Sequence, residues 1–167
     1  LPIDKFESIK RLHLQYDYLA KARDLFLMQC YTGLAYSDLM AFDFTKCKQA
    51  DGKYYYHAKR VKTDTDFTFQ LLAGAVSVLK KYNFKLPCIS NQKYNEYLKV
   101  IGMMVNVPNL HSHMGRATAA TLFLSFGMPL NVVAKVLGHT NIRQTQRYAR
   151  TLNKDVYSAF DNIDGKF

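Results

Sequence analysis

The sequence predicts a mainly α-helical domain with a small three-stranded antiparallel β-sheet. Apolar residues recur at helical spacing before and after the middle of the chain, as in residues 17–32 and 91–105. Residues 42–72 instead hold aromatic and β-branched residues between turn signals, which is typical of short antiparallel strands. A length of 167 residues is enough to bury a core without disulfides or metal. We therefore expect one domain over residues 1–167.

Two helices are expected before the sheet. Asp4 or Ser8 would cap a short helix that ends near Leu14. A longer helix over residues 17–32 would end at Gly33. Its buried stripe would comprise Leu19, Ala22, Leu25, Phe26, Gln29 and Cys30.

The sheet would follow a short helical turn near Met40. Its two clearest strands are residues 53–58 and 66–70, and they are joined by a hairpin with a basic tip at residues 59–63. Such a tip is usually a solvated turn, but in a basic protein it can contact phosphate oxygens.

Five helices are expected after the sheet. Four cover about residues 72–82, 91–105, 112–126 and 129–137, with Gly and Pro marking their ends. The fifth would start at Thr140 or Asn141 and carry Tyr148.

The charge balance predicts a polyanion as the partner. Lys and Arg outnumber Asp and Glu by 23 to 13, and the pI is about 9.5. A merely solubilising basic surface is the alternative. No apolar run reaches the roughly 18 residues of a membrane span, so we expect a soluble protein.

The three cysteines, Cys30, Cys47 and Cys88, form no CxxC pair and lie in apolar sequence. Together with the absence of a secretory signal, they predict reduced thiols in or near the core of a cytoplasmic protein. His111, His113 and His139 lack the short paired spacings of zinc ligands, so we expect no metal and no cofactor.

Residues 110–150 concentrate the polar side chains that could bind a phosphate. With Ser112 as N-cap, His113 and Arg116 share a face in the first turns of a helix, where backbone N–H groups attract anions. His139 would follow the helix that ends at Gly138. The buried side of the His113–Arg116 helix would consist of Ala117, Ala120, Phe123 and Leu124. We therefore expect His113 and Arg116 to lie at the rim of the core.

This pattern resembles the catalytic domain of the tyrosine recombinases, or phage-type integrases. The resemblance covers about Thr32 to Arg150. It rests on His113-x-x-Arg116, on Leu137-Gly138-His139 with Tyr148 nine residues further on, and on the preceding Thr32-Gly33-Leu34 and Lys62-Thr63.

The resemblance implies a role for each of these residues. Tyr148 would be the nucleophile that forms a 3′-phosphotyrosyl link to DNA, with neither ATP nor metal required. His113 and Arg116 would contact the scissile phosphate, and His139 would donate to it. Lys62 would protonate the leaving 5′ oxygen, and Asp38 would support the catalytic groups.

One position departs from the family pattern, because Ala35 stands where an arginine usually follows Thr-Gly-Leu. Another cation could fill the space, the protein could be weakly active, or it could be a DNA-binding regulator that does not cut. We favour the first explanation. The candidate cations, which are also candidate DNA contacts, are Lys59, Arg60, Arg143 and Arg147.

The resemblance further implies double-stranded DNA as substrate and the recombination or integration of a mobile genetic element. A type IB topoisomerase would share the nucleophile chemistry. We expect the family's N-terminal core-binding domain to be absent. The tail, about residues 151–167, has an apolar stripe that would dock on a neighbouring subunit of a tetramer, or alternatively on its own domain.

Overall fold

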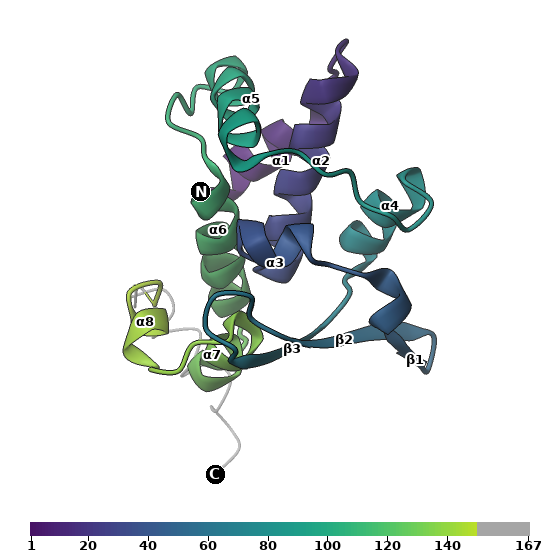
Figure 1. Cartoon of the computed structure of the whole chain (residues 1–167). Helices are drawn as coiled ribbons and strands as arrows, with labels where there is room; N and C mark the ends of the chain where they lie inside the picture. The colour runs from purple at the N-terminus through teal and green to yellow at the C-terminus, as the bar shows by residue number, and fades with distance from the viewer. Residues whose placement is uncertain (150–167) are drawn as a thin grey trace, which may run out of the picture.

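The longest helix, α2 (Asp17–Thr32), runs through the middle of the computed structural model, which describes residues 1–149 (Figure 1). Its bounds are those predicted, and Gly33 ends it in the left-handed conformation with φ of 74°. Ten of its 16 residues are buried, more than one amphipathic face would supply. The reason is that α1, α3, α4, α5 and α6 all pack against it.

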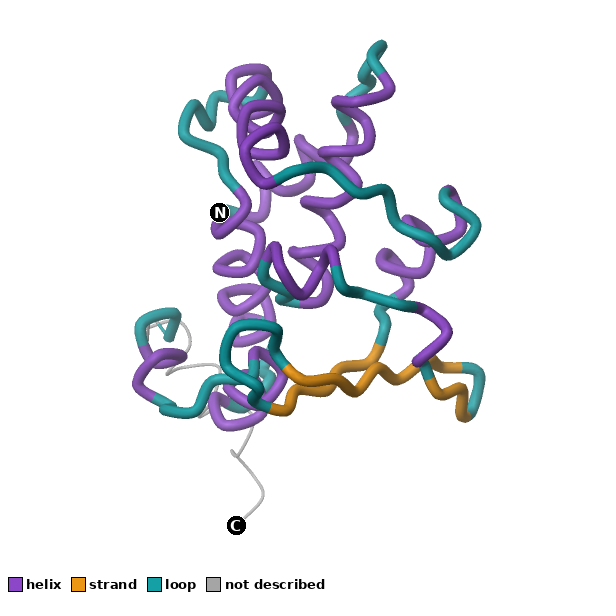
Figure 2. Tube along the Cα trace, viewed as in Figure 1, coloured by secondary structure: helices purple, strands orange, loops and turns teal. Residues whose placement is uncertain are grey.

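The predicted fold class, mainly α-helical with a three-stranded antiparallel sheet, is confirmed (Figure 2). No helix between residues 1 and 149 is long and apolar enough to cross a membrane. Besides α2, the elements are α1 (Ile3–Arg11), α3 (Tyr36–Met40), a 3₁₀ turn (Phe44–Lys46), β1 (Lys48–Ala50), β2 (Lys53–Lys59), β3 (Asp66–Gln70), α4 (Ala73–Lys81), α5 (Asn91–Met104), α6 (Ser112–Ser125), α7 (Leu130–Leu137) and α8 (Arg143–Gln146).

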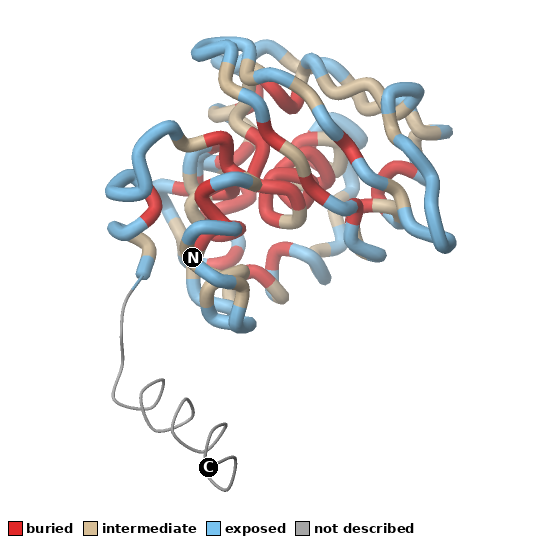
Figure 3. Tube along the Cα trace, turned by 90° about the horizontal axis from the view of Figure 1, so that it is seen from below, coloured by how far each residue is buried: buried red, intermediate tan, exposed pale blue. Residues whose placement is uncertain are grey.

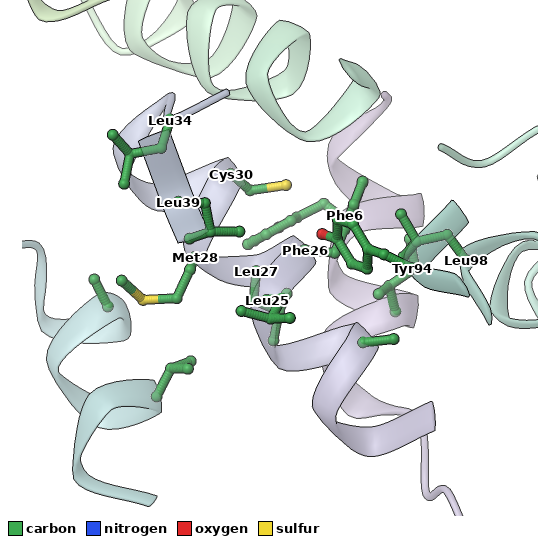
Figure 4. Packing of buried hydrophobic residues seen from close by; sticks show 14 of the residues in the cluster. Phe6, Leu25, Phe26, Leu27, Met28, Cys30, Leu34, Leu39, Tyr94 and Leu98 are labelled. Atoms are coloured by element: carbon green, nitrogen blue, oxygen red, sulfur yellow. The ribbon is translucent and has the colours of Figure 1, made fainter. Parts of the chain in front are cut away.

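The main hydrophobic core surrounds α2, and the whole predicted stripe of this helix is buried (Figures 3 and 4). Phe26 and Leu25 of α2 and Tyr94 and Leu98 of α5 are fully buried in it. Burying an apolar side chain of this size stabilises the fold by about 1.5–3 kcal/mol. The core therefore fixes α2, whose C-terminal end lies beside the candidate site.

The sheet has the order β1-β2-β3, and both pairs of strands are antiparallel. Tyr56 of β2 is paired with Phe69 of β3, and Ala58 with Phe67. Tyr56, Phe67 and Phe69 are buried, so one face of this hairpin belongs to the core. Helix α7 packs against β3, which brings the hairpin tip close to the end of α7 (Figure 1).

The first helix differs from its prediction at both ends. Pro2 occupies the N-cap position, and neither Asp4 nor Ser8 caps the helix. The helix ends at Arg11 because Leu12 adopts an extended ψ of 128° and its carbonyl accepts a hydrogen bond of 2.7 Å from Arg23 Nη1. A tertiary contact thus ends a helix that sequence periodicity would continue.

Two later elements also differ. Ser112 is the first residue of α6 rather than its cap, which is His111. The prediction that a helix carries Tyr148 is wrong, since α8 ends at Gln146. The Tyr148 N–H bonds to the Thr145 carbonyl three residues back, so the chain continues as a turn. At the start of α8, Asn141 Oδ1 accepts from the Arg143 N–H at 2.9 Å, but the N-cap position is Ile142, whose side chain makes no cap hydrogen bond.

Candidate active site

Arg116 is held by the ends of two helices. Its side chain lies in the second turn of α6, and only 6% of the residue is exposed. Nη1 donates to the Gly33 carbonyl and Nη2 to the Leu137 carbonyl, each at 2.7 Å. These carbonyls end α2 and α7, where the helix dipole favours a cation. Burial and the nearby Arg60 lower the pKa of Arg116 to about 10, so it remains charged at neutral pH.

This burial corrects the prediction that the His113–Arg116 pair lies at the rim of the core. Arg116 is buried, whereas Phe123 and Leu124 are only half-buried. Helix α6 meets α2 so closely that a Cβ at Gly115 would lie 2.8 Å from Gln29 Cβ. The physical reason is that backbone carbonyls satisfy the guanidinium, which therefore does not need solvent.

Arg60 lies next to Arg116. It follows β2, and only 11% of its side chain is exposed. Its Nη1 donates to the same Leu137 carbonyl at 2.6 Å, so one backbone oxygen joins two guanidinium groups. Gly138 leaves room for it, since a Cβ there would lie 3.0 Å from Arg60 Cδ and Cγ.

Asp38 holds Arg60 and the hairpin together. This carboxylate is 3% exposed, and its Oδ1 accepts from the Val61 N–H at 2.8 Å. Its Oδ2 lies 2.7 Å from Arg60 Nε. These two atoms do not have hydrogen-bond geometry, so the contact is chiefly an attraction between charges. Asp38 makes no side-chain cap for α3.

A cavity of about 260 Å³ gathers the cationic groups. Its lining includes Arg60, Arg116, Arg147 and His139, so the cavity suits an anion. Thr63, Gly138 and Gln144 complete the lining. A larger cavity of about 320 Å³ lies beside the second half of β2, and Asp38 and Lys59 are the only predicted site residues that line it.

His139 occupies the turn directly after α7. Its backbone N–H bonds to the Ala134 carbonyl at 2.9 Å, and its Nδ1 lies 2.7 Å from Thr145 Oγ1. Partial burial, followed by the charges of Arg116, Arg147 and Arg60, lowers its pKa to about 4. The imidazole is therefore neutral at pH 7 and has one N–H to donate.

Acid is expected to destabilise the protein through His139. The folded-state pKa is about 4 against an ordinary value of 6.5, so the unfolded chain takes up the proton first as the pH falls. The free energy of unfolding should therefore fall between about pH 6.5 and pH 4. Thermal melting at several pH values would measure this, and His139→Gln should show a shallower decline than the wild type. Equal slopes for the two proteins would contradict it.

Tyr148 is partly buried beside α7. Its ring packs on a small apolar cluster of Ala120, Val133 and Leu137, and the Arg147 guanidinium lies 5.0 Å from the ring centroid. Its hydroxyl is buried and has no hydrogen-bond partner within residues 1–149. Tyr148 does not line the cavity, but its phenol lies near enough to Arg116 to act on the pKa of that guanidinium.

Other predicted site residues lie outside the cavity. His113 is exposed one turn before Arg116, and its pKa is lowered by partial burial, then by Arg116, Arg147 and His111. Lys62 is exposed at the hairpin tip between Arg60 and Thr63. Lys59 pairs with Asp64 at 3.2 Å, and Arg143 is exposed.

The sequence interpretation missed several groups in the site. Thr145 is fully buried beside His139, and Gln144 and Thr63 line the cavity. The Gly33 and Leu137 carbonyls are backbone atoms with no residue signature. The two glycines beside them were available signals, since Gly33 and Gly138 mark the helix ends from which these carbonyls project.

The cysteines and histidines form no metal site in the described part of the chain. Among residues 1–149, no three His, Cys, Asp or Glu side chains lie close enough to hold an ion. All three cysteines are free thiols, and Cys88 is exposed, which corrects its predicted place in or near the core. It lies in the irregular connection between α4 and α5, where the nearby Leu86 and Ile89 pack against the core.

Comparison with known proteins shows the same fold in several recombinases. The described fold resembles that of XerH site-specific recombinase in a post-cleavage complex with a palindromic difH substrate, with a TM-score of 0.73 and 20% identity over 94% of this chain and 49% of XerH. It also resembles XerA recombinase, with a TM-score of 0.72 and 15% identity over 100% of this chain and 64% of XerA. The third is the Tn1549 transposon integrase in complex with circular intermediate DNA. Its TM-score is 0.71, and its sequence is 15% identical over 98% of this chain and 66% of the integrase.

The chain belongs to the phage integrase family, whose sequence pattern it matches over residues 7–155. This membership confirms the resemblance drawn from His113, Arg116, His139 and Tyr148. The chain spans between about half and two thirds of the length of these three recombinases. A search of curated protein sequences finds no significant match.

Proposed function

We propose that the protein catalyses site-specific DNA recombination by cutting and rejoining DNA strands through a 3′-phosphotyrosyl intermediate. The observation that carries this proposal is the pair of guanidiniums, Arg60 and Arg116, joined by the Leu137 carbonyl on the wall of a cavity that His139 also lines. Two buried cations repel each other, and an anion between them relieves that repulsion. A phosphodiester is such an anion, and its two non-bridging oxygens can each accept hydrogen bonds from one of the planar guanidinium groups.

In the proposed reaction, the Tyr148 oxygen forms a bond to phosphorus while the bond from phosphorus to the 5′ oxygen breaks. His113 accepts the phenolic proton, and Lys62 donates a proton to the leaving oxygen. Arg60, Arg116 and His139 stabilise the negative charge that develops on the non-bridging oxygens. Attack by another 5′ hydroxyl reverses these steps, so the energy of the phosphoester is retained.

Arg60 takes the place of the arginine that is missing at Ala35. Of the four cations considered, Arg60 and Arg147 line the cavity with Arg116, whereas Lys59 and Arg143 do not. Arg60 also shares a hydrogen-bond acceptor with Arg116, which fixes its guanidinium close by. A complete pair of guanidiniums supports a catalyst over a regulator that only binds DNA.

Double-stranded DNA is the proposed substrate, in the cytoplasm of a cell that carries a mobile element. The excess of ten positive charges supports affinity for DNA of any sequence, weakening as salt rises. Assembly as a tetramer through the tail is also a proposal, because residues 151–167 lie outside the described part of the chain. Tyr148 would leave its apolar cluster as the DNA-bound assembly forms.

Covalent trapping tests the proposed function. The protein is mixed with a pool of nicked duplexes of randomised sequence, from which the short cleaved end diffuses away and leaves any adduct stable. We expect a protein–DNA adduct that resists denaturation and disappears in Tyr148→Phe. Tyr55→Phe, which changes an exposed tyrosine of β2, is the matched control and should keep the adduct.

Three results would overturn the proposal. An adduct that persists in Tyr148→Phe would assign the nucleophile elsewhere. DNA binding with no adduct from any duplex in the pool would favour the regulator. Relaxation of supercoiled plasmid without pairing of two sites would instead favour a type IB topoisomerase.

A further inference from the structure

The Thr145 hydroxyl bonds to a side chain of the candidate site rather than to a carbonyl of its own helix. Thr145 is fully buried, and its Oγ1 lies 2.7 Å from Nδ1 of His139. Six other hydroxyls in the described helices donate to the carbonyl four residues earlier, which is their usual local partner. This group comprises Ser8, Thr32, Ser77, Thr118, Thr121 and Ser125.

The direction of the Thr145–His139 hydrogen bond follows from which donors need a partner. If Nδ1 carried the proton, the buried Thr145 O–H would have no acceptor within residues 1–149, and an unpaired buried donor costs about 1–3 kcal/mol. If Thr145 donates to Nδ1, the ring proton lies on Nε2. His139 is half-buried and lines the cavity, so this second N–H can reach water there.

We propose that Thr145 is a positioning residue that holds His139 in the tautomer with its proton on Nε2. A phosphate oxygen only accepts hydrogen bonds, so a neutral His139 can stabilise it only by donating. The opposite tautomer would direct a lone pair at the phosphate. This inference rests on the proposed function for the role of His139, but the tautomer itself is a property of the free protein.

Thr145 also contacts the segment that carries the nucleophile. Its carbonyl accepts the Tyr148 N–H at 2.9 Å, and its own N–H bonds to the Ile142 carbonyl at 2.9 Å. The side chain of this residue therefore fixes the His139 ring, and its backbone holds the turn before Tyr148. Thr145 therefore contacts both His139, the proposed phosphate donor, and Tyr148, the proposed nucleophile.

Nitrogen NMR of ¹⁵N-histidine-labelled free protein tests the proposal, at a pH above 7 where the ring is neutral. We expect the His139 Nδ1 signal to be that of an unprotonated ring nitrogen and the Nε2 signal that of a protonated one. Loss of the signal in His139→Gln assigns it. Thr145→Val, which keeps the volume but loses the hydroxyl, should give a mixture of tautomers, and Thr145→Ser should restore the wild-type spectrum.

Adduct formation supplies the second readout. We expect Thr145→Val to lower the cleavage rate by about 10–100-fold, by analogy with groups that orient metal-binding histidines. Thr145→Ser should recover most of the rate, and DNA affinity should not change. Thr118→Val is the matched control, because Thr118 is equally buried but its hydroxyl donates to the Met114 carbonyl instead of to a site residue.

A protonated Nδ1 in the wild type, or an unchanged tautomer in Thr145→Val, would overturn the proposal. A cleavage rate in Thr145→Val equal to that of the wild type would also overturn it. Absence of any adduct from the wild type would count against the proposed function alone, since the NMR measurement on free protein would still decide the tautomer.

Discussion

Replacing Arg60 with alanine is expected to lower the rate of covalent adduct formation by about 10²–10³-fold, the effect typical of removing one preorganised donor to a developing anion. Arg116 keeps both of its carbonyl partners in this variant. The loss should therefore fall on the chemical step more than on DNA affinity. Rates from rapid mixing with a nicked duplex, divided by the folded fraction, would measure it.

Three companion variants sharpen this prediction. Arg60→Lys keeps a positive charge for Asp38 but lacks the planar guanidinium, so its rate should lie between those of the wild type and Arg60→Ala. Adding Ala35→Arg to Arg60→Ala should recover part of the rate, because the usual family arginine then returns. Arg11→Ala removes an exposed arginine from α1 and should leave the rate unchanged. A folded, DNA-binding Arg60→Ala protein within threefold of the wild-type rate would rule out this role for Arg60.

Replacing Asp38 with asparagine is expected to lower the free energy of unfolding by about 3–5 kcal/mol, the range for breaking a buried ion pair by removing one partner. The change leaves the largely buried Arg60 guanidinium without its counter-charge. A domain is stable by only about 5–15 kcal/mol, so this is a large fraction. Denaturant unfolding followed by circular dichroism would measure it.

The hairpin offers a matched control for Asp38. Asp64→Asn removes an exposed carboxylate that pairs with Lys59, and exposed pairs contribute about 0–1 kcal/mol. Asparagine also tolerates the φ of 53° at this position. Equal losses in the two variants would mean that the Asp38–Arg60 pair does not hold the hairpin.

The helices were predictable from sequence wherever local signals decide them. The bounds of α2 follow from its apolar stripe and from Gly33, and the strands β2 and β3 follow from aromatic residues between turns. The end of α1 and the brevity of α8 were not predictable. The first depends on a hydrogen bond from Arg23 eleven residues away, and the second on turn geometry before Tyr148.

The site was predictable in its residue types but not in its arrangement. Periodicity places Arg116 at the rim, because it treats every arginine as outward-facing. The partners that bury Arg116 are backbone carbonyls, which no sequence pattern records. Choosing Arg60 over Arg143 required the direction of a side chain at a hairpin, which depends on the packing of α7 against β3.

Because Arg60 and Arg116 share the backbone carbonyl of Leu137, the site should be sensitive to substitutions at residues whose side chains have no functional group. A backbone oxygen is present whatever side chain position 137 carries, so substitutions there change packing and leave the acceptor in place. Gly138 is different, because its φ is 62° and a Cβ there would crowd Arg60. Fewer substitutions should therefore be tolerated at Gly138 than at several of the charged residues around it. Directed evolution of the protein would have to keep this glycine, although it takes no part in the reaction.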